Sequence, residues 1–191
     1  MALKEIYISV DVEANGPLPG VHSMLSLGAV ALMRDGSTLG EFTRNLEELP
    51  DGTQHPATVA WWATQSPEVW EAHRTDLVSP ECAMTEFVAW VKSFAGYPVF
   101  VAMPAGYDWA FVYWYMMRFV GETPFGWNVI DMRTYMMAMR KTDYSKTNKQ
   151  YMPKRWFNPA MPHTHIALDD AREQAHIFIN MLQENLSTDG S

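Results

Sequence analysis

The apolar stretch IYISVDVEANGP, residues 6–17, constrains the fold most, because it reads as a buried strand that ends in two carboxylates. A strand points successive side chains to opposite faces, so Asp11 and Glu13 lie on the same face. Turn-forming residues then end the run: Asn15, Gly16 and Pro17. Two neighbouring acids without a basic partner repel each other, and a divalent cation or a shared proton would relieve that repulsion. The strand therefore ends in a candidate metal site.

The remaining chain alternates between strand and helix signals. Strands are predicted over residues 4–12, 23–33, 38–46, 98–103 and 126–132. Helices are predicted over residues 56–65, 66–75, 79–96, 107–121, 131–141 and 166–184, with a long loop over 142–164. A meander of three strands followed by alternating helices and strands favours an α/β fold with a five-stranded mixed sheet and helices on both faces. We expect one domain over residues 1–185 and a short disordered tail over 186–191.

Composition limits the function classes that the chain can serve. Its net charge of −8 argues against a protein that coats nucleic acid through phosphate contacts, but allows a nuclease that holds only a chain end. Cys82 is the single cysteine, so no internal disulfide can form and a reducing cytoplasm is expected. The N-terminus does not have the layout of a signal peptide, and no apolar run is long enough to span a bilayer. We expect a cytoplasmic protein without membrane contacts.

Further acidic and histidine side chains fall near predicted element boundaries. Asp108 follows the strand over 98–103, and Asp170 lies in the first turn of the last helix, five residues after His165. Each has an ordinary structural interpretation, since acids in a first helical turn are favoured by the helix dipole. Asp169 is open to the same interpretation as Asp170, and His163 and His165 to that of plain loop histidines. Residue types alone leave these alternatives open.

Three segments resemble the exonuclease motifs of the DEDDh family, the 3′-to-5′ exonucleases with an RNase H-like fold. The segments are SVDVEANGP, VAMPAGYDWAFVYWY and HTHIALDDAREQA. The third family motif reads His, any residue, Ala, Leu, any residue, Asp, Ala, which residues 165–171 match. This register selects His165 over His163 and Asp170 over Asp169. The chain departs from the usual pattern at Met103-Pro104-Ala105, where the family has an Asn, and at Ala14-Asn15-Gly16. Residues 57–70 resemble a helical segment of a phage and bacterial branch related to DexA-type exonucleases.

The resemblance implies a metal-dependent enzyme that removes nucleotides from the 3′ end of single-stranded RNA or DNA. Two divalent ions, Mg²⁺ or Mn²⁺, would assist the hydrolysis. The implied ligands are Asp11 for both ions, Glu13 and Asp170 for the first, and Asp108 for the second through water. His165 would be the general base, for which the ordinary pKa of histidine, about 6.5, is well suited. Family members often form homodimers or larger assemblies, so the same is expected here.

Substrate contacts are predicted from position. The turn at Asn15 and Gly16 lies beside the metal ligands, where it could meet the terminal sugar. Trp61 and Trp62 could stack on the terminal base, or could be core residues of a small helix. Six basic residues either guide the incoming strand or form a solvated loop face: Arg140, Lys141, Lys146, Lys149, Lys154 and Arg155.

Two other functions compete with the exonuclease. A phosphodiesterase for short or cyclic nucleotides would use the same metal site, and a non-catalytic nucleic-acid-binding relic would keep only the fold. A glycosidase using Asp11 and Glu13 is disfavoured, because its two carboxylates usually come from separate elements and it needs neither His165 nor Asp170.

Overall fold

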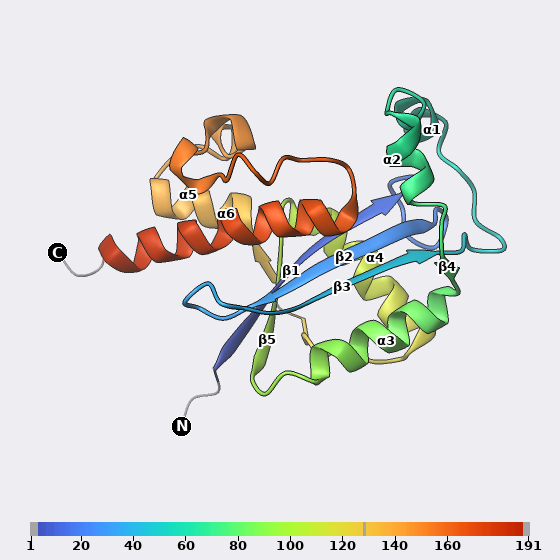
Figure 1. Ribbon diagram of the computed structural model, residues 1–191, viewed down its shortest axis with the longest axis horizontal. Coiled ribbons are helices and arrows are strands. Elements are labelled where there is room, and N and C mark those ends of the chain that lie inside the picture. Colours follow the sequence, from blue (N-terminus) through green and yellow to red (C-terminus); the bar gives the residue numbers. More distant parts are fainter. Residues whose placement is uncertain (1–3, 128, 189–191) are drawn as a thin grey trace.

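Six strands form one mixed sheet in the order β4-β3-β2-β1-β5-β6 (Figure 1). The structure, a computed structural model, describes residues 4–127 and 129–188. The strands are β1 (Glu5–Ala14), β2 (Met24–Leu32), β3 (Thr38–Leu46), β4 (Leu77–Val78), β5 (Tyr97–Ala102) and β6 (Val129–Asp131). The first three pair antiparallel, which confirms the predicted meander, while β4, β5 and β6 add in parallel. The predicted count of five strands is wrong, because β4 has only two residues and is too short to leave a periodic signal.

Helices cover both faces of this sheet. They are α1 (Pro56–Trp62), α2 (Pro67–Ala72), α3 (Pro80–Lys92), α4 (Ala105–Phe119), α5 (Met132–Arg140) and α6 (Ala167–Thr188). The long helix α6 crosses one face with α5 beside it, α3 and α4 lie on the other face, and α1 and α2 stand beside the end of β1 (Figure 1). The predicted loop over 142–164 contains three single-turn 3-10 helices: Tyr144–Lys146, Lys149–Tyr151 and Lys154–Trp156. None of the helices in the described part of the chain is both long and apolar enough to span a membrane.

The alternation of β1 decides which helices meet which side chains. Its even-numbered side chains are buried in the core that α3 and α4 cover: Ile6, Ile8, Val10 and Val12. The odd-numbered side chains face α6, where the Ser9 hydroxyl donates to the carbonyl of Ala171 at 2.9 Å. Asp11 and Glu13 follow Ser9 at a spacing of two. The predicted carboxylate pair therefore points to the face that carries α6.

Two element ends differ from the predictions. Helix α3 ends at Lys92 rather than near Gly96. Gly96 instead allows the backbone before β1 to pack closely against it, since a Cβ added at Gly96 would lie 2.5 Å from the carbonyl oxygen of Lys4. Helix α6 continues to Thr188, so the predicted disorder is wrong for residues 186–188, while 189–191 lie outside the described residues. Glu184 anchors this end of α6 through ion pairs with distant residues, which local patterns do not reveal.

Candidate active site

The end of β1 brings two carboxylates next to the start of α6. In the antiparallel pairing with β2, Asp11 lies opposite Gly28 and Glu13 lies opposite Ser26. Gly28 has no side chain to separate the sheet from α6, and a Cβ added there would lie 2.2 Å from the carbonyl carbon of Ala167. Glycine at this position therefore lets the N-terminus of α6 rest directly on β2, beside the two acids.

Asp170 joins this pair from the first turn of α6. Its side chain is buried, and its carboxylate accepts the backbone N–H groups of Thr164 at 2.8 Å and His165 at 3.0 Å. Single carboxylate oxygens of Asp11, Glu13 and Asp170 all lie within 4.8 Å of one another. The structure thus brings together three of the four predicted metal ligands in one compact group of oxygen donors.

Asp108, the fourth predicted ligand, lies in the first turn of α4 and is also buried. Its carboxylate accepts the backbone N–H of Val12 at 3.1 Å. The parallel pairing of β1 with β5 ends at Ser9 opposite Val101, so the N–H of Val12 lies beyond the paired region and needs this acceptor. The hydrogen bond fixes Asp108 beside the strand that carries Asp11 and Glu13.

The charges of the cluster conflict without a cation. Burial raises the pKa of Asp11 well above its usual range, and the negative charges of Asp108, Glu13 and Asp170 add to that rise. Burial, with Asp170 and Asp108 nearby, also raises the pKa of Glu13 to about 8, and burial raises that of Asp108 to about 7. Protons or a bound cation must therefore neutralise the cluster near neutral pH. Because every donor is a carboxylate oxygen, the group fits a hard divalent cation such as Mg²⁺ or Mn²⁺.

His165 is held in a left-handed backbone conformation, with φ at +59°. The backbone N–H of His165 donates a hydrogen bond to Asp170, and its carbonyl oxygen accepts a hydrogen bond from Nε2 of the buried His73 at 2.8 Å. Contacts on both sides therefore fix this strained residue. The ring packs edge-on against Trp61, with ring centroids 4.9 Å apart. Burial and the charge of His163 hold the pKa of His165 below its usual range. His165 is therefore neutral near pH 7 and able to accept a proton.

His163, which the motif register sets aside, is the histidine that contacts the acidic cluster directly. Its Nδ1 lies 3.0 Å from Asp170 and 3.5 Å from Glu173, and Lys149 pairs with the same Glu173. Hydrogen bonds to Asp170 and Glu173 raise the pKa of His163 to about 9. Burial alone would raise the pKa of Asp170, but the hydrogen bond from His163 helps to hold this pKa below its usual range. Only the proximity of His163 to His165 in the sequence signals this role.

The two tryptophans of α1 have different environments. Trp61 has 39 % of its surface exposed and packs on His165, whereas Trp62 is only 4 % exposed. The indole N–H of Trp62 donates to the carbonyl of Ala14 at 3.1 Å, and its ring packs against Trp70. Stacking of Trp62 on a terminal base does not fit this burial. Trp61 alone of the pair lies at the surface beside His165.

Hydrogen bonds and packing in the protein interior hold the turn at Asn15 and Gly16. Asn15 is 1 % exposed, its amide donates to Glu48 at 2.8 Å, and its side-chain oxygen accepts the N–H of Ser23 at 2.7 Å. The predicted contact between the Asn15 side chain and a terminal sugar does not fit these bonds. Gly16 is needed for close packing, since an added Cβ would lie 2.2 Å from the ring of His22.

A cleft opens beside the carboxylate cluster. Its lining residues are Asp11, Met103, Pro104, Arg133, Asn148, Lys149, His163, Asp170 and Gln174. Of the six basic residues predicted as a strand guide, Lys149 alone lines this cleft. Arg140 and Arg155 pair with Glu184, and Lys146 pairs with Asp143. Because Lys149 pairs with Glu173, four of the six basic residues form ion pairs within the described part of the chain.

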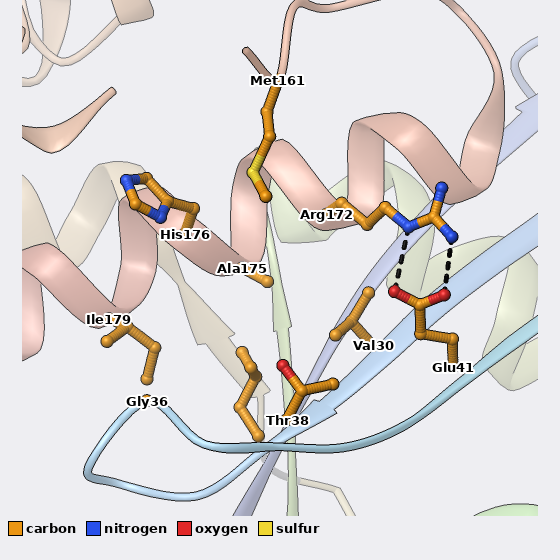
Figure 2. Close-up of a pocket in the computed structure, with 10 residues that line it drawn as sticks. Val30, Gly36, Thr38, Glu41, Met161, Arg172, Ala175, His176 and Ile179 are labelled. Carbon is orange, nitrogen blue, oxygen red and sulfur yellow. Dashed lines mark hydrogen bonds and ion pairs between the residues drawn. The ribbon is translucent and has the colours of Figure 1, made fainter. Parts of the chain in front are cut away.

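A second cavity lies under α6 on the β2–β3 side of the sheet (Figure 2). Arg172 projects beside it and donates two hydrogen bonds to Glu41, at 2.9 and 2.6 Å. Arg172 also pairs with Asp169 at 2.9 Å. The rest of the lining is mostly apolar and includes Val30, Leu32, Met161, Ala175 and Ile179. Asp169 thus serves an ion pair on this side, while Asp170 faces the carboxylate cluster, as the motif register predicts.

Comparison with known proteins agrees with this geometry. The model of the 3′-5′ exoribonuclease Rv2179c-like domain family matches residues 6–182. The 3′-5′ DNA exonuclease Cap18 of Escherichia coli is 30 % identical over 97 % of both chains. Among solved structures, the nuclease domain of 3′hExo, a DEDDh family member bound to rAMP, has a TM-score of 0.71 and 14 % identity over 95 % of this chain and 93 % of that one. E. coli Exonuclease I in complex with a dA16 oligonucleotide has a TM-score of 0.66 and 14 % identity over 95 % of this chain and 41 % of that one. The predicted exonuclease fold is confirmed.

Proposed function

The chain belongs to the 3′-5′ exoribonuclease Rv2179c-like domain family and is a 3′-5′ exonuclease, and on this premise we propose that it hydrolyses single-stranded 3′ ends with two divalent cations. One observation carries the proposal. Four carboxylates from β1, α4 and α6 converge beside a neutral histidine, and burial with mutual repulsion disfavours the ionised forms of Asp11, Glu13 and Asp108 unless a cation is bound.

Each member of the cluster has a role in this proposal. Asp11 would help to hold both cations, Glu13 and Asp170 would hold one of them, and Asp108 would help to hold the other. When bound, the cations polarise the scissile phosphate and stabilise the leaving oxygen. His165 takes the proton of the attacking water, whose oxygen bonds to phosphorus. The bond from phosphorus to the 3′ oxygen of the preceding nucleotide breaks, its electron pair leaves with that oxygen, and a nucleoside 5′-monophosphate is released.

Surroundings of the cluster support the assignment of the remaining residues. His73 and Asp170 hold the His165 backbone from both sides, so the base is oriented before substrate arrives. His163 keeps Asp170 ionised and therefore ready to bind a cation. Trp61 presents an exposed ring beside His165, which suits stacking on the terminal base.

Degradation of matched strands tests the function and ranks the substrates. The family description specifies RNA, whereas the Cap18 relative acts on DNA, so both are offered as 5′-labelled single strands of the same sequence. We expect a ladder that shortens from the 3′ end in Mg²⁺ or Mn²⁺ and no cleavage in EDTA. Absence of cleavage of either polymer with any ion would contradict the proposal and favour a small-nucleotide substrate.

The thermal stability of the metal-free protein should fall as the pH rises, because of the carboxylate cluster. Glu13 and Asp108 have raised pKa values, about 8 and about 7, so the folded chain binds more protons than the unfolded chain above pH 5. The melting temperature in EDTA should therefore fall by about 5 °C or more as the pH rises from 5 to 8. Mg²⁺ should remove most of this fall. A melting temperature in EDTA that rises over this range would contradict the predicted strain in the cluster.

A further inference from the structure

Arg133 is a cation that the proposed chemistry does not use, although it lines the cleft with Asp11 and Asp170. It lies in the first turn of α5 and is half-buried. Its Nε donates to the hydroxyl of the buried Thr147 at 3.1 Å, and one terminal nitrogen donates to the carbonyl of Tyr144 at 3.4 Å. The guanidinium also lies over the Tyr144 ring, 4.4 Å from its centroid. Neutral groups therefore hold Arg133 in a fixed orientation.

Two other cations near Arg133 are neutralised. Lys149, which lines the same cleft, pairs with the buried Glu173. Arg140 on the same helix pairs with Glu184. Within residues 4–127 and 129–188, by contrast, no carboxylate forms an ion pair with Arg133. In a chain with a net charge of −8, this unpaired guanidinium is a preorganised donor for an anion.

The position of Arg133 indicates which anion it receives. The cleft runs from the carboxylate cluster to Arg133 and Asn148, and neither His165 nor Trp61 lines it. Trp61, the residue proposed to stack on the terminal base, lies outside this cleft, so the cleft is free to receive the strand on the 5′ side of the scissile phosphate. We propose that Arg133 binds the first backbone phosphate on the 5′ side of the scissile one, with the Asn148 amide as an additional donor; this rests on the proposed exonuclease function. Such a contact would favour strands over mononucleotide esters.

Two substrates separate this role from a role at the scissile phosphate. The p-nitrophenyl ester of thymidine 5′-monophosphate has a scissile phosphodiester and no second phosphate, whereas an oligonucleotide has both. In Arg133→Gln, we expect the KM for the oligonucleotide to rise about 10- to 100-fold, the usual range for a lost hydrogen bond to a charged group. The kcat/KM for the ester should stay within about twofold. Arg140→Gln is the matched control and should change neither value.

Chemical removal of the phosphate charge gives an independent readout by binding. A 5′-fluorescent oligonucleotide carries a neutral methylphosphonate at the second linkage from its 3′ end, and binding is followed by fluorescence anisotropy in EDTA. The wild-type protein should bind this strand more weakly than the unmodified strand. Arg133→Gln should bind the two strands with equal affinity. The inference would be overturned if the methylphosphonate and Arg133→Gln weakened binding additively. It would also be overturned if Arg133→Gln impaired hydrolysis of the oligonucleotide and of the ester equally. If the wild-type protein cleaves neither substrate, the exonuclease chemistry fails, and the anisotropy comparison still decides the phosphate contact.

Discussion

Asp11→Asn should lower the kcat for cleavage of a single-stranded 3′ end by about 10³-fold or more. Asp11 is the central acid of the cluster, since its oxygen lies within 4.8 Å of those of Glu13 and Asp170 and its charge interacts with that of Asp108. Asparagine keeps the shape of the side chain and removes the negative charge that a shared divalent cation needs. A 10³-fold loss corresponds to about 4 kcal/mol of transition-state stabilisation. Single-turnover cleavage of a 5′-labelled strand at saturating Mg²⁺ measures the loss.

The same variant should be more stable than the wild-type protein without metal. Burial and three neighbouring acids disfavour the charged form of Asp11, so removal of that charge relieves repulsion. The melting temperature in EDTA should rise, and added Mg²⁺ should no longer raise it. Asp169→Asn is the control, because Asp169 pairs with Arg172 outside the cluster, and it should keep wild-type kcat. If Asp11→Asn keeps more than about a tenth of the activity, Asp11 does not hold the ions.

Gly28→Ala should disrupt the site without changing any proposed ligand. The added Cβ would lie 2.2 Å from the carbonyl carbon of Ala167 and 2.3 Å from the backbone nitrogen of Leu168. Both atoms belong to the start of α6, so the helix must move away from β2. Asp170 and the His165 backbone bonded to it would move as well. We expect the free energy of unfolding to fall by about 3 kcal/mol and kcat to fall by about 10²-fold or more.

Gly106→Ala is the matched glycine control. Gly106 lies in α4, two residues from Asp108, and an added Cβ there would meet nothing within 4 Å. Alanine favours helix by about 1 kcal/mol over glycine, so this variant should be as stable as the wild-type protein or more so. Denaturant unfolding and the strand assay applied to both variants would check the contrast. Wild-type activity in Gly28→Ala would mean that the contact of α6 with β2 does not position the site.

Local pattern was sufficient for Asp11 and Glu13, whereas the choice of Asp170 over Asp169 needed the family resemblance. The period of two in β1 places Asp11 and Glu13 on one face, and the structure directs that face to α6. The motif register separates Asp170 from Asp169, and the structure shows Asp169 engaged with Arg172 instead. These features depend on spacing within one element or one motif, which a sequence displays directly.

Features that depend on distant contacts were not predictable. Asn15 is buried because Ser23 and Glu48 bond to its side chain, and neither partner is implied by the turn sequence. The local sequence likewise does not say that Trp62 turns inward while Trp61 stays exposed. Whether a basic residue is free or paired is likewise a tertiary property. For this reason the six basic residues between positions 140 and 155 predict either a strand guide or a solvated loop face, although Arg133 outside that segment lines the cleft without an ion pair among the described residues.

We expect the carboxylate cluster to hold divalent ions against the scissile phosphate. Replacement of one non-bridging oxygen of the 3′-terminal linkage with sulfur tests this most directly, because Mg²⁺ prefers oxygen ligands and Mn²⁺ accepts sulfur more readily. Cleavage of one phosphorothioate diastereomer should slow by about tenfold or more in Mg²⁺ and recover in Mn²⁺. Equal rates for the sulfur and oxygen strands in both ions would contradict ion contact with the scissile phosphate.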